Sequence, residues 1–331
     1  MATVLSCIMP IYNAADYLNE AVESVLSQNW PYFELILVDD GSTDGSEAIC
    51  DEWNRTDDRV RVIHQTNQGA AAARNTGVSV SEGRILCFVD ADDKLLPGAF
   101  AAIVPAFDNR NRDLVSFGMD LREGTDLQHA AHPAFSCEDL SEFWPHFLEY
   151  YQSGLFPSLC NKAYRGDLVR EMTFDTRCRT GEDLDFNLNY WSKVRSFEHI
   201  DRPLYEYNLR PDSLTRNPVT DRMEVNRAVL HKLKAFLHEH GQENLYPLLA
   251  AARLPWDAAA FFDLLMDPER PFTADQRRQG LEKLFGDELW HTALLTELSK
   301  RSGRCAKMQR MAAAQKSPRL ALFSLKFAKK K

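Results

Sequence analysis

The sequence predicts an α/β fold: a mixed, mostly parallel sheet with helices on both faces, followed by an α-helical C-terminal region. Apolar runs of strand length alternate with segments of helical spacing from residue 4 to residue 89, as in parallel sheets that helices cover. Polar side chains follow the expected strands at their carboxyl ends, where such sheets bind ligands. From about Asp221 onwards, helical spacing dominates.

The regular part of the pattern ends at Pro97. The strands expected before it are Val4 to Met9, Phe33 to Val38, Val60 to His64 and Ile85 to Val89. The helices expected between them span Ala14 to Gln28, a segment from about Asp44 to Trp53, and Ala70 to Val80. The strands are short apolar runs, and the first helix carries apolar residues three and four positions apart.

Beyond Pro97 the pattern is less regular. A strand is expected at Leu114 to Met119, a helix at Ser136 to Tyr151, a helix from Arg179–Asp183 to Trp191, and a polar loop at residues 205 to 215. We therefore predict an α/β domain at residues 1–218, a helical region at 219–317 and a basic, amphipathic tail at 318–331.

Composition restricts the class of protein. A chain of 331 residues with 44% hydrophobic and 26% charged residues is typical of soluble globular domains. The seven cysteines are scattered and contain no C-x-x-C, which argues against a disulfide framework or a zinc site and fits a reducing cytosol. The N-terminus lacks the features of a signal peptide, so we expect a cytoplasmic protein.

The C-terminal tail differs in charge from the rest of the chain. Residues 301 to 331 hold ten Lys or Arg and no acidic residue, so the net charge of −9 leaves −19 on residues 1 to 300. Leu322, Phe323, Leu325 and Phe327 recur at helical spacing beside lysines. This pattern predicts a segment that lies on an anionic membrane surface, with a solvated tail as the alternative. The acidic body does not favour nucleic acid as a partner.

Three carboxylates follow the strand at Ile85 to Val89 within four residues. Asp90 and Asp92 stand two positions apart, so they point the same way on an extended segment. Carboxylates this close repel one another unless a cation neutralises them. The arrangement suits a hard divalent ion such as Mg²⁺ or Mn²⁺. An acidic turn that only ends the strand is the alternative.

Residues 1 to about 215 resemble family 2 glycosyltransferases of the GT-A fold. The resemblance depends on five segments in the expected order: Pro10-Ile11-Tyr12-Asn13, Val38-Asp39-Asp40-Gly41-Ser42-Thr43-Asp44, Gly69 to Gly77 with Arg74-Asn75, Phe88-Val89-Asp90-Ala91-Asp92-Asp93, and Gly181-Glu182-Asp183. It implies an inverting transfer from a nucleotide-sugar, usually a UDP-sugar, to a saccharide acceptor in bacterial surface-glycan synthesis (lipopolysaccharide, capsule or exopolysaccharide).

The resemblance also implies roles for individual residues. The residues implied in binding the nucleotide-sugar are Pro10, Tyr12, Asn13, Asp39, Asp40, Arg74, Asp90, Ala91 and Arg210. Pro10 and Tyr12 would flank the base and Asp40 would accept a hydrogen bond from uracil.

Further roles concern the metal, the base and the diphosphate. Arg74 is expected to support the Asp40 side of the pocket, and Arg210 to pair with the diphosphate. Asp92, with Asp90, would hold Mn²⁺ or Mg²⁺. Asp183 would be the catalytic base, with Glu182 beside it.

The chemistry of transfer requires such groups whatever the family. Breaking a sugar–phosphate bond develops negative charge on a diphosphate, which a divalent cation stabilises. An acceptor hydroxyl is a poor nucleophile, so a carboxylate must take its proton. With one base and no enzyme nucleophile, displacement is direct and the anomeric centre inverts.

Several alternatives remain open at the level of the sequence. Asp39 and Asp40 are also good helix-capping residues, Arg74 also fits a surface helix, and Glu182 and Asp183 also suit the first turn of a helix. Asn161, Lys162 and Arg165 either shape the acceptor side or form a solvated loop. His199 is not included as a metal ligand, since a lone histidine is more often structural.

The function itself has two alternatives. A nucleotidyltransferase would use the same sheet and metal, although a glycine-rich loop after the first strand is missing here. A non-catalytic sugar-nucleotide or glycan-binding protein is the other alternative. For a transferase we expect a lipid-linked or other saccharide acceptor and a peripheral location on the inner face of the membrane.

Overall fold

The fold is described from a computed structural model, which covers residues 4–177, 181–210, 222–268, 270, 272–302 and 304–324. The chain divides into two compact units, Met1–Pro211 and Asp212–Lys331. The predicted domain boundary at residue 218 lies outside the described residues.

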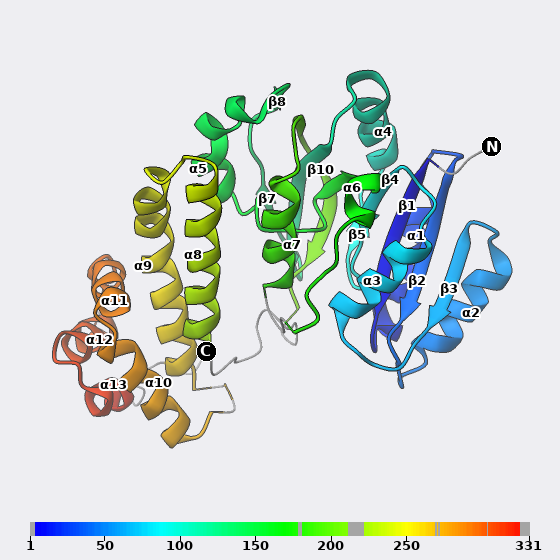
Figure 1. The fold of residues 1–331 in the computed structure, drawn as a ribbon. Coiled ribbons are helices and arrows are strands. Elements are labelled where there is room, and N and C mark those ends of the chain that lie inside the picture. Colours follow the sequence, from blue (N-terminus) through cyan, green and yellow to red (C-terminus); the bar gives the residue numbers. More distant parts are fainter. Residues whose placement is uncertain are drawn as a thin grey trace. The chain divides into compact units, whose positions relative to one another are not determined.

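The first unit contains a mixed sheet (Figure 1). Its parallel part consists of β1 (Leu5–Ile11), β2 (Phe33–Asp39), β3 (Val60–His64) and β4 (Ile85–Phe88). The remaining strands are β5 (Lys94–Leu95), β6 (Leu114–Glu123), β7 (Asp126–Ala130), β8 (Phe135–Cys137), β9 (Lys162–Arg165) and β10 (Phe197–Asn208). The main order is β3-β2-β1-β4-β9-β6-β10-β5, with β9 antiparallel to both of its neighbours and β6 parallel to β10.

Helices flank this sheet, as expected. They are α1 (Ala15–Leu26), α2 (Ser46–Thr56), α3 (Ala70–Val80), α4 (Ala99–Arg110), α5 (Trp144–Gln152), α6 (Gly166–Arg170) and α7 (Glu182–Trp191). Helix α3 approaches β1 closely at Gly77, where a Cβ atom would lie 2.4 Å from Cγ2 of Ile8. Only glycine fits at this distance, so the alanine-rich, glycine-containing sequence of α3 permits the close packing.

Two local predictions are wrong. Residues 136 and 137 belong to strand β8, and helix α5 begins only at Trp144, because residues 135–137 pair with β10. Residues 205–208 form the end of β10 instead of a loop, because they pair with β5 and β6 and Glu206 bonds to Arg122 at 2.6 Å. In both places pairing between distant segments overrides the local pattern.

The second unit is helical. It comprises α8 (Arg222–Glu239), α9 (Leu245–Met266), α10 (Ala274–Gly286), α11 (Glu288–Ser299), α12 (Arg304–Ala314) and α13 (Pro318–Ser324). Phe262, Phe285 and Trp290 are buried in its core. Helix α13, the first part of the predicted tail, contacts α12 and α10, whereas residues 325–331 lie outside the described residues. Among the described helices, none has the length and apolar character needed to cross a membrane.

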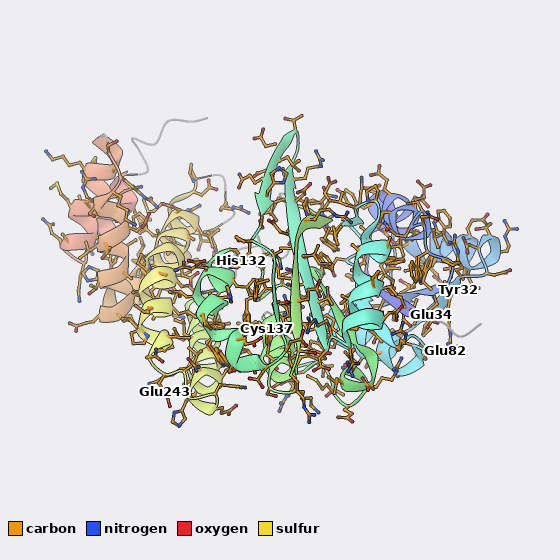
Figure 2. All side chains as sticks on the ribbon, turned by 90° about the horizontal axis from the view of Figure 1, so that it is seen from above. Tyr32, Glu34, Glu82, His132, Cys137 and Glu243 are labelled. Atoms are coloured by element: carbon orange, nitrogen blue, oxygen red, sulfur yellow. The ribbon has the colours of Figure 1, made fainter. Side chains whose placement is uncertain are left out.

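The buried hydroxyl of Ser6 connects three segments at the end of the sheet where β1 begins. Ser6 Oγ donates to Glu34 Oε1 at 2.6 Å and accepts from the backbone N–H of Gly83 at 2.8 Å. The N–H of Glu82 donates to the same Glu34 oxygen at 2.8 Å, and Figure 2 shows Glu34 and Glu82 near each other. The three contacts join β1, β2 and the turn before β4.

Replacing Ser6 with alanine is expected to lower the free energy of unfolding by about 1–3 kcal/mol, since the buried Gly83 N–H loses its acceptor. Ser79→Ala removes an exposed hydroxyl in the same unit and is expected to change stability by less than about 0.5 kcal/mol. Urea unfolding followed by circular dichroism measures both. Equal stability of the two variants would contradict a stabilising role for the hydrogen bonds of Ser6.

Candidate active site

The parallel register brings the polar strand ends to one edge of the sheet. Ile11 of β1 lies opposite Asp39 of β2, and Ile8 lies opposite Phe88 of β4. Tyr12, Asp40 and Asp90, which follow these strands, therefore emerge at the same edge, as the alternation of strands and helices predicts.

The loop after β1 is fixed to the loop after β2. Asn13 has a left-handed backbone (φ 49°), its Oδ1 accepts from the N–H of Thr43 at 2.8 Å, and its own N–H donates to Ser42 Oγ at 3.0 Å. These bonds hold the loop while Tyr12 remains 55% exposed. The ring of Tyr12 is thus accessible to a ligand, whereas Asn13 holds the two loops together through its bonds to Ser42 and Thr43. Pro10, within β1, is partly exposed.

Asp39 and Asp40 are both buried, and both accept hydrogen bonds from neighbouring loops. Asp39 accepts from the N–H of Ser42 at 3.0 Å and faces His64 Nδ1 at 3.0 Å. The Asp40 oxygens accept from Gln65 Nε2 at 2.7 Å and from the backbone N–H groups of Gln68 and Gly69. Gly69 directly precedes α3, so Asp40 fixes the start of that helix. The contact between Asp40 and uracil remains a prediction.

Arg74 of α3 connects three carboxylates. It is 4% exposed, and its guanidinium donates to Asp90 Oδ1 at 3.1 Å, to Asp183 Oδ1 at 3.1 Å and to Glu182 Oε1 at 3.4 Å. These carboxylates raise the pKa of Arg74 further above its ordinary value against the effect of burial, so the group is permanently charged. The expectation that Arg74 supports the Asp40 side is wrong: its contacts run to the other carboxylates.

Asp183 lies in the first turn of α7. Gly181 precedes this helix with a left-handed backbone (φ 81°), a conformation that glycine adopts without strain. Burial raises the pKa of Asp183 to about 7; Arg74 opposes this shift, while the charges of Glu182 and Asp90 add to it. The Asp183 side chain is still 34% exposed. It therefore combines access with a pKa suited to proton transfer near neutral pH.

Asp92 pairs with Arg210. Asp92 belongs to the acidic tip of the sheet, the segment Asp90–Asp93 that follows β4. The distance from Arg210 Nη2 to Asp92 Oδ2 is 2.6 Å, and the guanidinium lies 4.4 Å from the centre of the Tyr17 ring. Burial and the neighbouring Asp90 charge raise the pKa of Asp92 above its ordinary value. Ala91 between the two aspartates is buried, and so is Asp93, which leaves Asp90 and Asp92 as the partly exposed carboxylates of the motif.

Residues at the end of β10, which are not among the predicted site residues, hold the acidic tip. Tyr205 Oη donates to Asp93 Oδ2 at 2.8 Å and accepts from the Asp90 N–H at 3.1 Å. The N–H of Asn208 donates to Asp93 Oδ1 at 2.8 Å, and Asn208 Nδ2 donates to the carbonyl oxygen of Asp92 at 2.7 Å. The signal was missed because these residues fell in the segment predicted as a loop.

The weaker candidates lie in different places. Lys162 and Asn161 are fully buried beside the Asp90 end of β4. Arg165 lies opposite Ile85, at the other end of β4, and pairs with Asp113 at 3.1 Å.

His199 is buried within the unit. Its ring nitrogens face Ser116 Oγ at 2.7 Å and the carbonyl oxygen of His132 at 3.0 Å, and burial lowers its pKa to about 4. Figure 2 marks His132. These partners make His199 structural, in line with its omission from the predicted metal ligands.

The donor set at the tip fits a hard cation with few protein ligands. Within the described parts of the chain, no group of three or more His, Cys, Asp or Glu side chains could hold a metal ion. Asp90 and Asp92 provide partly exposed carboxylate oxygens, and the neighbouring Asp90 charge adds to the effect of burial in raising the pKa of Asp92. Mg²⁺ and similar ions bind through one or two carboxylates together with substrate phosphates and water.

Comparison with known proteins identifies the family. Residues 6–171 match the family model described as "Glycosyl transferase family 2", and this match covers half of the chain. The chain belongs to glycosyltransferase family 2. This family 2 enzyme is therefore a glycosyltransferase. It is neither a nucleotidyltransferase nor a non-catalytic binding protein, the two alternatives that the sequence left open.

Two relatives of known name differ in how much of their own length this chain covers. The chain is 38% identical over 229 residues to glycosyltransferase GlyG of Streptococcus pneumoniae, covering 65% of this chain and 74% of GlyG. It is 30% identical over 212 residues to the minor teichoic acid biosynthesis protein GgaB of Bacillus subtilis, covering 62% of this chain and 23% of GgaB.

The fold also matches a solved structure. The crystal structure of S. aureus TarS 1–349 in complex with UDP-GlcNAc matches with a TM-score of 0.67 at 18% identity, over 98% of this chain and 91% of that one. The likeness confirms the predicted GT-A type α/β architecture with a C-terminal helical region.

The raised pKa of Asp183 predicts a pH-dependent stability. Its pKa is about 7 in the folded state against 3.8 for an ordinary aspartate, so folding favours the protonated form. The stabilisation is present below about pH 4 and is lost as the pH rises to about 7. The wild type should lose unfolding free energy relative to Asp183→Asn across this window.

Urea unfolding at several pH values measures the difference. Asp126→Asn, an exposed carboxylate on β7, serves as control and should follow the wild type. Parallel pH profiles for the wild type and Asp183→Asn would show that Asp183 titrates normally.

Proposed function

We propose that the enzyme transfers a sugar from a UDP-sugar to a saccharide acceptor with inversion at the anomeric carbon. The observation that supports this most directly is that Asp183 and Asp90 both accept hydrogen bonds from Arg74. A partly exposed carboxylate with a pKa of about 7 is thereby coupled to the acidic tip of the sheet. The complexes of TarS with UDP and with UDP-GlcNAc support a UDP-sugar donor.

Asp183 is the proposed general base. It takes the proton of an acceptor hydroxyl while the hydroxyl oxygen forms a bond to the anomeric carbon. The bond from that carbon to the phosphate oxygen breaks in the same displacement, and UDP leaves with the electron pair. Because one displacement occurs on the face opposite the leaving group, the configuration inverts. Glu182 and Arg74 orient Asp183 through the shared ion pair.

The donor is proposed to bind along the edge of the sheet. Tyr12 and Pro10 would flank the base, and Asp40, which holds the adjoining loop, would accept a hydrogen bond from uracil. Asp90 and Asp92 would hold Mn²⁺ or Mg²⁺, which when bound supplies positive charge to the diphosphate. Arg210, now paired with Asp92, is close enough to the tip to offer a bidentate contact to phosphate oxygens.

The acceptor is proposed to belong to a bacterial surface glycan. The similarity to GgaB, a minor teichoic acid biosynthesis protein, supports this class. We further propose that the acceptor is a lipid-linked saccharide and that the basic tail keeps the enzyme at the inner face of the membrane.

Asp92→Asn should reduce UDP release from UDP-GlcNAc in the presence of Mn²⁺ by roughly 100-fold or more, because a charge that holds the cation is lost. A panel of other UDP-sugars is assayed alongside, since the sugar is unknown. Asp126→Asn is the matched control and should retain activity. Full activity of Asp92→Asn in EDTA would refute the metal role.

Truncation after Ser324 should weaken binding to vesicles that contain anionic lipid. It removes residues 325–331, which include Lys326, Lys329, Lys330 and Lys331, and each lysine near the surface contributes about 1 kcal/mol. Helix α13 remains in place. Co-sedimentation measures binding, with neutral vesicles as control; unchanged co-sedimentation would end the tail hypothesis.

A further inference from the structure

The loop between α5 and β9 is held by buried side chains. Residues 154–161 form no regular helix or strand, so most of their carbonyl groups need partners from elsewhere. Lys162 Nζ donates to the carbonyl oxygens of Leu155, at 2.6 Å, and Ser158. Tyr164 Oη lies 3.2 Å from the carbonyl oxygen of Leu159. Side chains of β9 thus hold the loop from one side.

Three acceptors surround the Lys162 nitrogen. The third is Asn161 Oδ1 at 2.9 Å, and Asn161 Nδ2 donates to the carbonyl oxygen of Phe117 at 3.2 Å, which turns the amide oxygen towards Lys162. An ammonium group has three protons to donate, whereas a neutral amine has two. The three contacts match the three protons of an ammonium group. Burial lowers the pKa of Lys162 well below its ordinary value, and the charge of Asp183 opposes this effect.

Helix α7 holds the same loop from the other side. Asn187 Nδ2 donates to the carbonyl oxygens of Pro157 at 3.1 Å and Ser158 at 3.0 Å, while its Oδ1 accepts from Tyr164 Oη at 2.8 Å. Asn187 stands four residues after Asp183, so the two side chains share one face of α7. The loop is thereby attached to the helix that carries the proposed base.

The far end of the loop reaches the acidic tip. Cys160 Sγ donates to Asp90 Oδ2 at 3.3 Å. A single segment therefore spans from Asn187 on α7 to Asp90 after β4, and it carries none of the predicted nucleotide-binding residues. A shift of this segment would change the distance between Asp183 and the tip.

We propose that Lys162 is a positioning residue for the transfer reaction: with Asn187 it fixes loop 154–161 between α7 and Asp90, and so sets the position of Asp183 relative to the donor. This inference rests on the proposed role of Asp183 as base. A misplacement of about 1 Å can cost on the order of 100-fold in rate, whereas contacts to the uracil side would be unaffected.

The test compares Lys162→Met with the surface control Lys193→Met, which removes a half-exposed lysine paired with Glu171. UDP-GlcNAc hydrolysis in Mn²⁺ is measured without an acceptor. Lys162→Met should lower kcat by roughly 10- to 100-fold while KM for the donor stays within about threefold. Hydrogen exchange of peptides covering residues 154–161 should become faster, and exchange in β1 and β2 should not change.

A second, milder variant keeps Lys162 intact. Asn187→Ser removes the donor to Pro157 and Ser158 and should give the same split between kcat and KM. A rise in KM in step with the fall in kcat, unchanged kcat, or unchanged exchange of the loop would overturn the proposal. If Asp183→Asn hydrolyses UDP-GlcNAc like the wild type, the proposed base is wrong; if it is inactive while Lys162→Met keeps its kcat, only this inference fails.

Discussion

The site depends on one buried guanidinium shared by three carboxylates. Arg74 donates hydrogen bonds to Asp90, which follows β4, and to Glu182 and Asp183 at the start of α7. Without a cation between them these charges would repel one another, and without the carboxylates a buried arginine would be costly to desolvate. The start of α3, which carries Arg74, is fixed in turn by Asp40. A single helix therefore links the loop after β2, the acidic tip and the proposed base.

The acidic residues of the edge fall into two groups. Asp39, Asp40 and Asp93 are 2%, 2% and 1% exposed, and donors of the chain occupy their oxygens. They hold loops in place. The side chains of Asp92 and Asp183 are 23% and 34% exposed, and each is paired with an arginine. A substrate or cation can reach these two, so the same residue type serves structure where it is buried and chemistry where it is exposed.

Rigid elements around the edge restrict how these side chains can move. The end of β10 supports the tip through Tyr205 and Asn208, and the buried Lys162 and Asn187 support the loop beside it. Catalytic groups that act by position need such support, because their effect falls steeply with small displacements. The supporting residues are polar and buried or half-buried, and their partners lie in the turn after β4 and in loop 154–161.

The sequence alone determined the alternation of strands and helices, the edge at which the polar groups emerge, and the motifs that contain Asp90, Asp92 and Asp183. The alternation, the edge and the place of Asp90 and Asp92 follow from local periodicity and from the rule that parallel strands share one carboxyl edge, whereas Asp183 is implied by the resemblance to the family alone. Only the tertiary structure decided that Arg74 serves Asp90 and Asp183 rather than Asp40, and that residues 205–208 extend β10. Arg74 and Asp183 are 109 positions apart, and spacing along the chain carries no information on which distant carboxylate a buried arginine meets.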